Sequence, residues 1–134
     1  MDLYRDLILD HYRNPRNFGH LPKPDATAEA ANISCGDRIV MELLITHHPS
    51  PITIGDIRFS GEGCAISQAS ASMLTEKVKD MSKKQIARMT LDDILAMLGT
   101  ELTPSRVKCA TLPLEVLQKA IFQGTSLPKQ GSTL

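Results

Sequence analysis

The sequence predicts an α+β domain in which a small antiparallel sheet is covered by about four to five helices. Residues 38–45 alternate between strongly apolar and other side chains, and residues 52–59 contain a second set of regularly spaced apolar residues, as expected for two strands. From residue 65 onward the apolar spacing is that of helices. The length of 134 residues suits one domain with a substantial buried core.

The N-terminal region is predicted to begin with an amphipathic helix. Apolar side chains recur at helical spacing over residues 2–13, and Asp2 is a suitable N-cap. Asn14 and Pro15 end this helix, because the residue before a proline disfavours helical backbone. The alanine-rich residues 26–33 fit more than one type of element, and we interpret them as a further strand.

The two clearest strands, residues 38–45 and 52–59, are predicted to form an antiparallel hairpin. The first has one strongly apolar face, which suits a strand with that face on the core. Gly55 and Asp56 interrupt the second strand and indicate a β-bulge. A turn rich in histidine and proline, residues 47–51, connects them.

Several helices are predicted after the hairpin. The first begins at Ala65, and Ser82 can cap the next. Thr90 and Asp93 resemble a capping box at the start of a third helix, with aspartate in place of the usual glutamate or glutamine. Gly99 ends that helix, because glycine readily adopts the left-handed conformation found after a helix C-terminus.

The last helix is predicted from apolar residues at helical spacing over 107–121. Proline is tolerated in the first turn of a helix, so we place Pro113 there, with Cys109 at or just before the helix start. We expect one domain over residues 1–123 and a flexible tail over residues 124–134.

Composition excludes several classes of protein. Fifteen basic and fifteen acidic residues give a net charge of zero, which argues against nucleic-acid binding. No apolar run approaches the ~20 residues of a membrane span, and the charged N-terminus does not resemble a signal peptide. We therefore expect a cytoplasmic protein. Its three cysteines cannot all pair internally, so thiols for metal or sulfur chemistry are favoured over disulfides.

The first candidate site is the Cys35-Gly36-Asp37 segment. In extended backbone, side chains two positions apart point to the same side, so Cys35 and Asp37 could bind one metal ion. The alternative is an ordinary surface turn.

The other two cysteines have surroundings that favour thiolate. Cys64 follows the glycine-rich residues 61–63 at a predicted helix start, where the helix dipole lowers a thiol pKa. Cys109 follows the cations Arg106 and Lys108, which act in the same direction. The alternative for Cys64 is a tight turn followed by a buried cysteine without a metal. The alternative for Cys109 is a core cysteine beside a solvated pair of basic residues.

Taken together, the three cysteines lie at predicted element boundaries, which tend to gather at one end of a layered domain. Three thiolates and the Asp37 carboxylate would form a four-ligand set for zinc or for the iron of an iron–sulfur cluster. Arg106 and Lys108 would partly offset its negative charge. Asp37 suits an exchangeable ligand, since carboxylate is a harder donor than thiolate. We assign none of the four histidines as a ligand.

Four ordered segments of the chain resemble one protein family. They are LYRDLILDHYRNPRNFG at 3–19, NISCGD at 32–37, FSGEGCAISQASASMLTE at 59–76 and RVKCATLPLEVL at 106–117. Each is similar to a segment of the IscU/SufU/NifU N-terminal family of iron–sulfur cluster assembly proteins. The resemblance implies a three-stranded antiparallel sheet with flanking helices and a metal site at one end. By motif position, that site consists of Cys35, Asp37, Cys64 and Cys109.

The resemblance also implies function. Such proteins accept sulfur as a persulfide from a cysteine desulfurase, assemble a [2Fe–2S] cluster, and pass it to apo iron–sulfur proteins. By position, Cys35 is the expected persulfide acceptor. A homodimer is one alternative for the oligomeric state, which the sequence leaves open.

The chain combines features of two subfamilies. Lys108 before Cys109 resembles the SufU type, whose members bind Zn²⁺ and act as sulfurtransferases that activate the desulfurase. Cys109 follows Cys64 by 45 positions, which resembles the more compact IscU type. The Leu-Pro-Pro-Val-Lys chaperone motif of IscU is replaced by ELTPSRVK at 101–108. The hypotheses are therefore a cluster scaffold, a zinc-dependent sulfurtransferase, and a domain with purely structural zinc.

Overall fold

The structure, a computed structural model, describes residues 3–46 and 51–125. His47 and His48 of the predicted turn lie outside the described residues, as do the predicted N-cap Asp2 and residues 126–134 of the predicted tail. Among the described residues, no helix is both long and apolar enough to span a membrane.

The sheet has three antiparallel strands, as predicted, and their order is β1-β2-β3. They are β1 (Ala26–Asn32), β2 (Asp37–Thr46) and β3 (Thr53–Glu62). The predicted bulge is present at Gly55, because Leu44 pairs with Asp56 whereas Ile45 pairs with Ile54. One residue of β3 is thus left without a partner on β2, which locally increases the strand twist.

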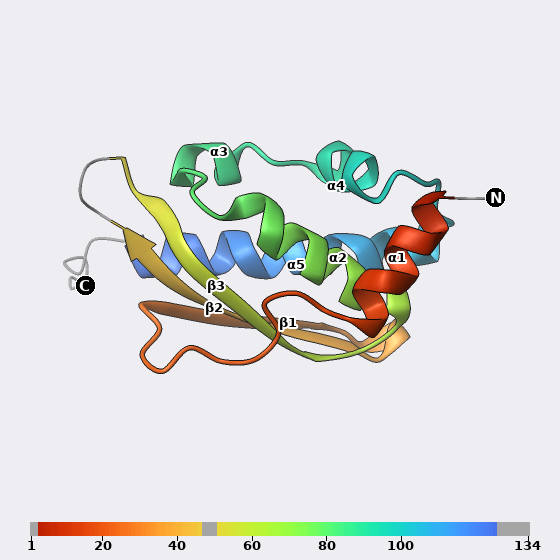
Figure 1. The fold of residues 1–134 in the computed structure, drawn as a ribbon, viewed down its shortest axis with the longest axis horizontal. Coiled ribbons are helices and arrows are strands. Elements are labelled where there is room, and N and C mark those ends of the chain that lie inside the picture. The colour runs from red at the N-terminus through yellow and green to blue at the C-terminus, as the bar shows by residue number, and fades with distance from the viewer. Residues whose placement is uncertain (1–2, 47–50, 126–134) are drawn as a thin grey trace.

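Five α-helices in the described part of the chain cover one face of this sheet, and Figure 1 shows their arrangement. They are α1 (Leu3–Arg13), α2 (Ala65–Val78), α3 (Lys83–Ala87), α4 (Leu91–Leu98) and α5 (Pro104–Thr125). α5 packs on β1 and β2, and α2 packs on β3. α3 and α4 lie on the side of α2 and α5 that faces away from the sheet. A short 3₁₀ helix, η1 (Ile33–Cys35), joins β1 to β2.

Local capping explains the two short helices. Ser82 begins α3 with a capping box completed by Gln85, and Thr90 begins α4 with a box completed by Asp93. Gly99 ends α4 in the left-handed conformation, with a φ of 72°. These start and stop signals satisfy helix-end groups from within the segment itself, and all three predictions are confirmed.

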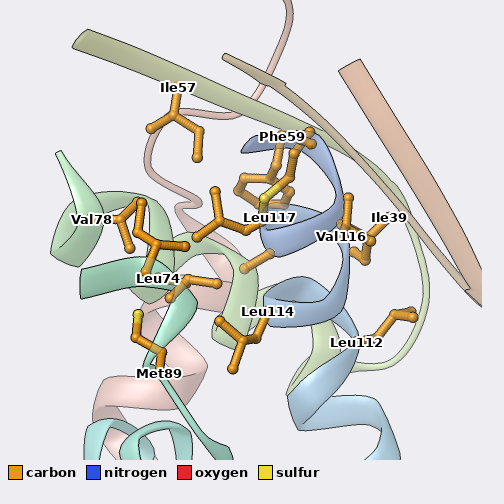
Figure 2. Packing of buried hydrophobic residues seen from close by; sticks show 14 of the residues in the cluster. Ile39, Ile57, Phe59, Leu74, Val78, Met89, Leu112, Leu114, Val116 and Leu117 are labelled. Carbon is orange, nitrogen blue, oxygen red and sulfur yellow. The ribbon is translucent and has the colours of Figure 1, made fainter. Parts of the chain in front are cut away.

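The hydrophobic core lies between the sheet and the helices. Its fully buried side chains include Phe59 from β3, Leu74 from α2 and Leu117 from α5. Figure 2 shows these three side chains within one group of buried hydrophobic residues that come from the sheet and the helices. The core holds α2 and α5 in one orientation relative to the strands. The starts of α2 and α5 and the β1–β2 connection lie at the same end of the molecule (Figure 1).

The predicted start of the last helix is wrong. α5 begins at Pro104, and Pro113 lies inside the helix rather than in its first turn. Pro104 suits the first helical position, and the Val107 N–H already donates to the Thr103 carbonyl at 3.0 Å. Pro113 removes one hydrogen bond to the Cys109 carbonyl, but it is buried within the packed face of α5, and packing of that face overrides the local cost. Cys109 therefore lies in the second turn of α5.

A buried histidine joins α1 to α2. His11 is only 5% exposed, and its Nδ1 lies 2.7 Å from Ser72 Oγ. The Arg16 N–H donates to the same Oγ at 2.8 Å, so the Ser72 hydroxyl proton can point to Nδ1. His11 Nε2 faces Glu76 Oε1 at 3.8 Å. Burial lowers the pKa of His11 below its ordinary value and Arg16 lowers it further, while Glu76 and Asp10 act in the opposite direction.

We expect this histidine to make the protein less stable as the pH falls below about 6.5, the ordinary histidine pKa. The unfolded chain takes up a proton there, whereas folded His11 resists it because its pKa is lowered. In urea unfolding experiments, the free energy of unfolding should fall less for His11→Gln than for the wild type between about pH 7.5 and pH 5.5. His20→Gln, at an exposed histidine, is the control. An equal loss in the wild type and His11→Gln would contradict the prediction.

Candidate metal centre

Three side chains with metal-binding atoms meet at the end of the molecule where α2 begins. One carboxylate oxygen of Asp37 and the sulfurs of Cys64 and Cys109 all lie within 4.8 Å of one another. They come from β2, the N-cap of α2 and the second turn of α5. The predicted meeting of these three side chains is thus present in the fold, although they are far apart in the sequence.

Asp37 is the first residue of β2 and is 2% exposed. Its Oδ1 accepts hydrogen bonds from the Cys64 N–H at 2.8 Å and from the Ser67 hydroxyl at 3.1 Å. Its Oδ2 is buried and has no hydrogen-bond partner among the described residues. A buried carboxylate oxygen without a partner is costly, and a cation would remove that cost.

Cys64 is the N-cap of α2, as its predicted position at a helix start requires. Its sulfur accepts a hydrogen bond from the Ser67 N–H at 3.5 Å, which satisfies one of the free amides of the first turn. The preceding Gly63 has a φ of 151°, and a Cβ at this residue would overlap Asp37 Oδ1. The absence of a side chain at Gly63 therefore allows the Asp37 carboxylate to lie against the start of α2.

Cys109 is buried in α5, and its Sγ lies 3.8 Å from the Ser105 carbonyl oxygen. The prediction that all three cysteines lie at element boundaries is wrong for this one, because α5 starts earlier than expected. The sulfur is brought to the site by the packing of α5 on the sheet rather than by a helix start. The effect of the helix dipole is correspondingly weaker here, since it falls off within the first turn.

The backbone of Cys35 lies in η1, two residues before Asp37. Its side chain lies outside the part of the chain that the structure describes. The expectation of extended backbone across residues 35–37 is wrong, because Gly36 has a φ of 70° and closes the turn between the paired residues Asn32 and Asp37. Glycine suits this left-handed conformation because it has no Cβ.

The two predicted supporting cations, Arg106 and Lys108, are exposed on the first turns of α5. Lys108 borders two hollows of about 270 and 240 Å³ that it shares with Asn32. One of these hollows is also lined by Ser34, next to Cys35 in the chain. Lys108 therefore lies near the turn that contains Cys35.

The described histidines make other contacts. His11 contacts Ser72 and Glu76, and His20 Nδ1 lies 2.7 Å from Glu42 Oε2. Sequence reasoning missed Ser67, which contacts two of the clustered residues. Ser67 lies three residues after the N-cap Cys64, and the side chain of an N-cap residue commonly accepts a hydrogen bond from the backbone N–H at that position. This spacing is the signal that could have identified Ser67.

The donor set fits a soft divalent metal. Two sulfurs and one carboxylate oxygen match the donors that bind Zn²⁺ or the iron of a small cluster, and the Cys35 turn lies next to Asp37 in the chain. Asp37 Oδ2 is buried without a hydrogen-bond partner among the described residues, so this oxygen is available to such a metal.

The chain is similar to known proteins. The family model for the NifU-like N terminal domain matches residues 3–129. The chain is 38% identical over 136 residues to the zinc-dependent sulfurtransferase SufU of Bacillus subtilis, covering 89% of each chain. It is 37% identical over 128 residues to the iron–sulfur cluster assembly scaffold protein IscU of Aquifex aeolicus, covering 96% of this chain and 78% of that protein.

The fold is also similar to solved structures. One is a proposed iron–sulfur cluster assembly scaffold for the SUF system from Fervidobacterium islandicum. It has a TM-score of 0.71 at 29% identity, over 87% of this chain and 94% of that one. The N-terminal part of a NifU-like protein from Brucella abortus has the same fold, with a TM-score of 0.72 at 21% identity.

The contacts of Asp37 predict how two substitutions differ in the metal-free protein. Asp37→Ala removes the acceptor for the Cys64 N–H and the Ser67 hydroxyl, whereas Asp37→Asn retains one acceptor oxygen. We expect Asp37→Ala to be less stable than Asp37→Asn by about 1–3 kcal/mol. Urea unfolding in the presence of a chelator measures this difference, with Asp92→Ala, at an exposed aspartate, as the control. Equal stability of the two variants would show that Asp37 does not act as the acceptor for α2.

Proposed function

Because the chain belongs to the NifU-like N terminal domain family, we propose that it is a scaffold protein for iron–sulfur cluster assembly. The observation that carries this proposal is the grouping of Asp37, Cys64 and Cys109 within 4.8 Å, next to the turn that contains Cys35. Relatives named IscU that cover most of this chain support it. We place the activity in the reducing cytoplasm, where thiols persist.

We propose Cys35, Asp37, Cys64 and Cys109 as the ligands. Asp37 is the hardest of the four donors, and it is the one expected to exchange most readily on a soft metal. Arg106 and Lys108 reduce the net negative charge of three thiolates and a carboxylate. The nascent [2Fe–2S] cluster is the cargo of the site, and we propose that it passes from there to apo recipient proteins.

Sulfur would enter from a cysteine desulfurase that carries a persulfide. The Cys35 thiolate attacks the outer sulfur of that persulfide, a new S–S bond forms, and the electron pair of the broken bond returns to the desulfurase cysteine as thiolate. The transfer needs no external oxidant or reductant. Support comes from the exposure of the acceptor turn, in which Ile33 is 93% exposed and Ser34 and Gly36 are also exposed.

The second candidate function is a zinc-dependent sulfurtransferase that activates the desulfurase. The Lys108-Cys109 pair and the 38% identity to the Bacillus subtilis SufU protein favour it. In this case the same four residues would hold a resident Zn²⁺, which keeps bound thiolates deprotonated. Cys35 would leave the metal when the desulfurase docks and would accept the sulfur.

Metal content separates the candidates. If the protein is a scaffold, oxygen-free incubation with a desulfurase, L-cysteine, Fe²⁺ and a dithiol reductant, which supplies the electrons that turn persulfide sulfur into sulfide, should produce a brown species with equal amounts of iron and acid-labile sulfide. A colourless protein that keeps about one zinc per chain and stimulates the desulfurase would support the sulfurtransferase instead. Unfolding on metal removal, with no effect on the desulfurase in either form, would indicate a structural zinc site.

We predict that Cys35→Ala abolishes persulfide acceptance, because the attacking thiolate is absent. The measurement is the mass of the chain after incubation with a desulfurase and L-cysteine, where the wild type should gain one sulfur atom. Ser34→Ala, an exposed neighbour in the same turn, is the control and should gain the sulfur normally. Normal sulfur gain by Cys35→Ala would assign the acceptor to Cys64 or Cys109.

A further inference from the structure

Ser67 is a buried hydroxyl residue in the first turn of α2 that contacts two of the candidate ligands. It is 0% exposed. Its Oγ lies 3.1 Å from Asp37 Oδ1, 3.1 Å from the Cys64 carbonyl oxygen and 3.9 Å from Cys64 Sγ. The hydroxyl has one proton, and an ionised carboxylate is a stronger acceptor than a carbonyl or a sulfur. The donor role of Ser67 therefore belongs mainly to Asp37.

The two oxygens of Asp37 have different surroundings as a result. Oδ1 accepts from both the Cys64 N–H and the Ser67 hydroxyl, whereas Oδ2 is buried without a hydrogen-bond partner among the described residues. Two donors on one oxygen fix the rotation of the carboxylate. They also draw negative charge toward Oδ1 and leave Oδ2 as the oxygen with unoccupied lone pairs.

We propose that Ser67 is the positioning residue that makes Asp37 a single-oxygen metal ligand through Oδ2 and sets how firmly that ligand is held. This inference rests on the proposed metal site but assigns a role to a residue outside the ligand set. Groups that hydrogen-bond to metal ligands orient them, and their loss commonly costs about 10–100-fold in metal affinity. Without the hydroxyl, the Cys64 N–H alone would hold the carboxylate, which could then rotate away from the metal.

The test measures metal release from the full chain loaded with one Zn²⁺, using a chromogenic chelator in excess. We expect Ser67→Ala to release zinc about 10-fold faster than the wild type. The matched control is Ser70→Ala, one turn further along α2, since Ser70 is equally buried and its hydroxyl donates at 2.6 Å to the Ala110 carbonyl rather than to Asp37. Equal release rates for the Ser67→Ala and Ser70→Ala variants would overturn the proposal.

A double-mutant cycle shows whether Ser67 acts through Asp37. In an Asp37→Ala background, Ser67→Ala should change the release rate by less than about 2-fold, because the ligand that it positions is already absent. A further increase of about 10-fold there would overturn the proposal and place the effect on the Cys64 sulfur. Co²⁺ bound in place of Zn²⁺ gives a second readout, since the visible bands of Ser67→Ala should shift only when Asp37 is present.

Two controls separate this inference from protein stability and from the proposed function. Circular dichroism of each metal-free variant checks folding, and Ser67→Gly provides a second removal of the hydroxyl if Ser67→Ala does not fold. Tight Zn²⁺ binding by the wild type together with normal release by the Ser67 variants would refute the role of Ser67 alone. Failure of the wild type to bind either Zn²⁺ or Co²⁺ would refute the metal site as well.

Discussion

The hydrogen bond from the Cys64 N–H to Asp37 Oδ1 is the interaction on which the candidate centre depends. It joins the start of α2 to the start of β2 at a distance of 2.8 Å. A carboxylate at a helix N-terminus is stabilised by the free amides and by the helix dipole. The bond requires Gly63 to lack a side chain, and it brings Asp37 close to the Cys64 sulfur. One contact therefore determines the positions of two donors from different elements.

The same contact relates the site to protein stability. One oxygen of Asp37 is fully hydrogen-bonded, but the other is buried without a partner among the described residues. The fold therefore uses Oδ1, which completes the cap of α2, while Oδ2 remains available to a cation. A metal that binds Oδ2 would stabilise the folded chain, since the grouped ligands exist only in that state.

The extent to which the sequence predicted the structure differs between local and long-range features. The capping boxes at Ser82 and Thr90, and the bulge at Gly55, were predictable because short-range hydrogen bonds and glycine geometry determine them. The start of α5 was not, because the packed face around Pro113 outweighs the hydrogen bond that this proline removes. The backbone at Cys35 was also mispredicted, since Gly36 permits a left-handed turn where extended backbone was expected.

The sequence by itself determined the donor types and the presence of strands and helices near them, but not where each of those elements begins. Cysteine and aspartate chemistry, glycine spacing and apolar periodicity are properties of residues and of their near neighbours. Only the tertiary structure decided that Asp37, Cys64 and Cys109 meet, that Cys109 reaches the site from within a helix, and that Ser67 contacts Asp37. The physical reason is that these distances depend on how α2 and α5 pack against the sheet. That packing results from many contacts between residues far apart in the sequence, and local sequence patterns do not specify these contacts.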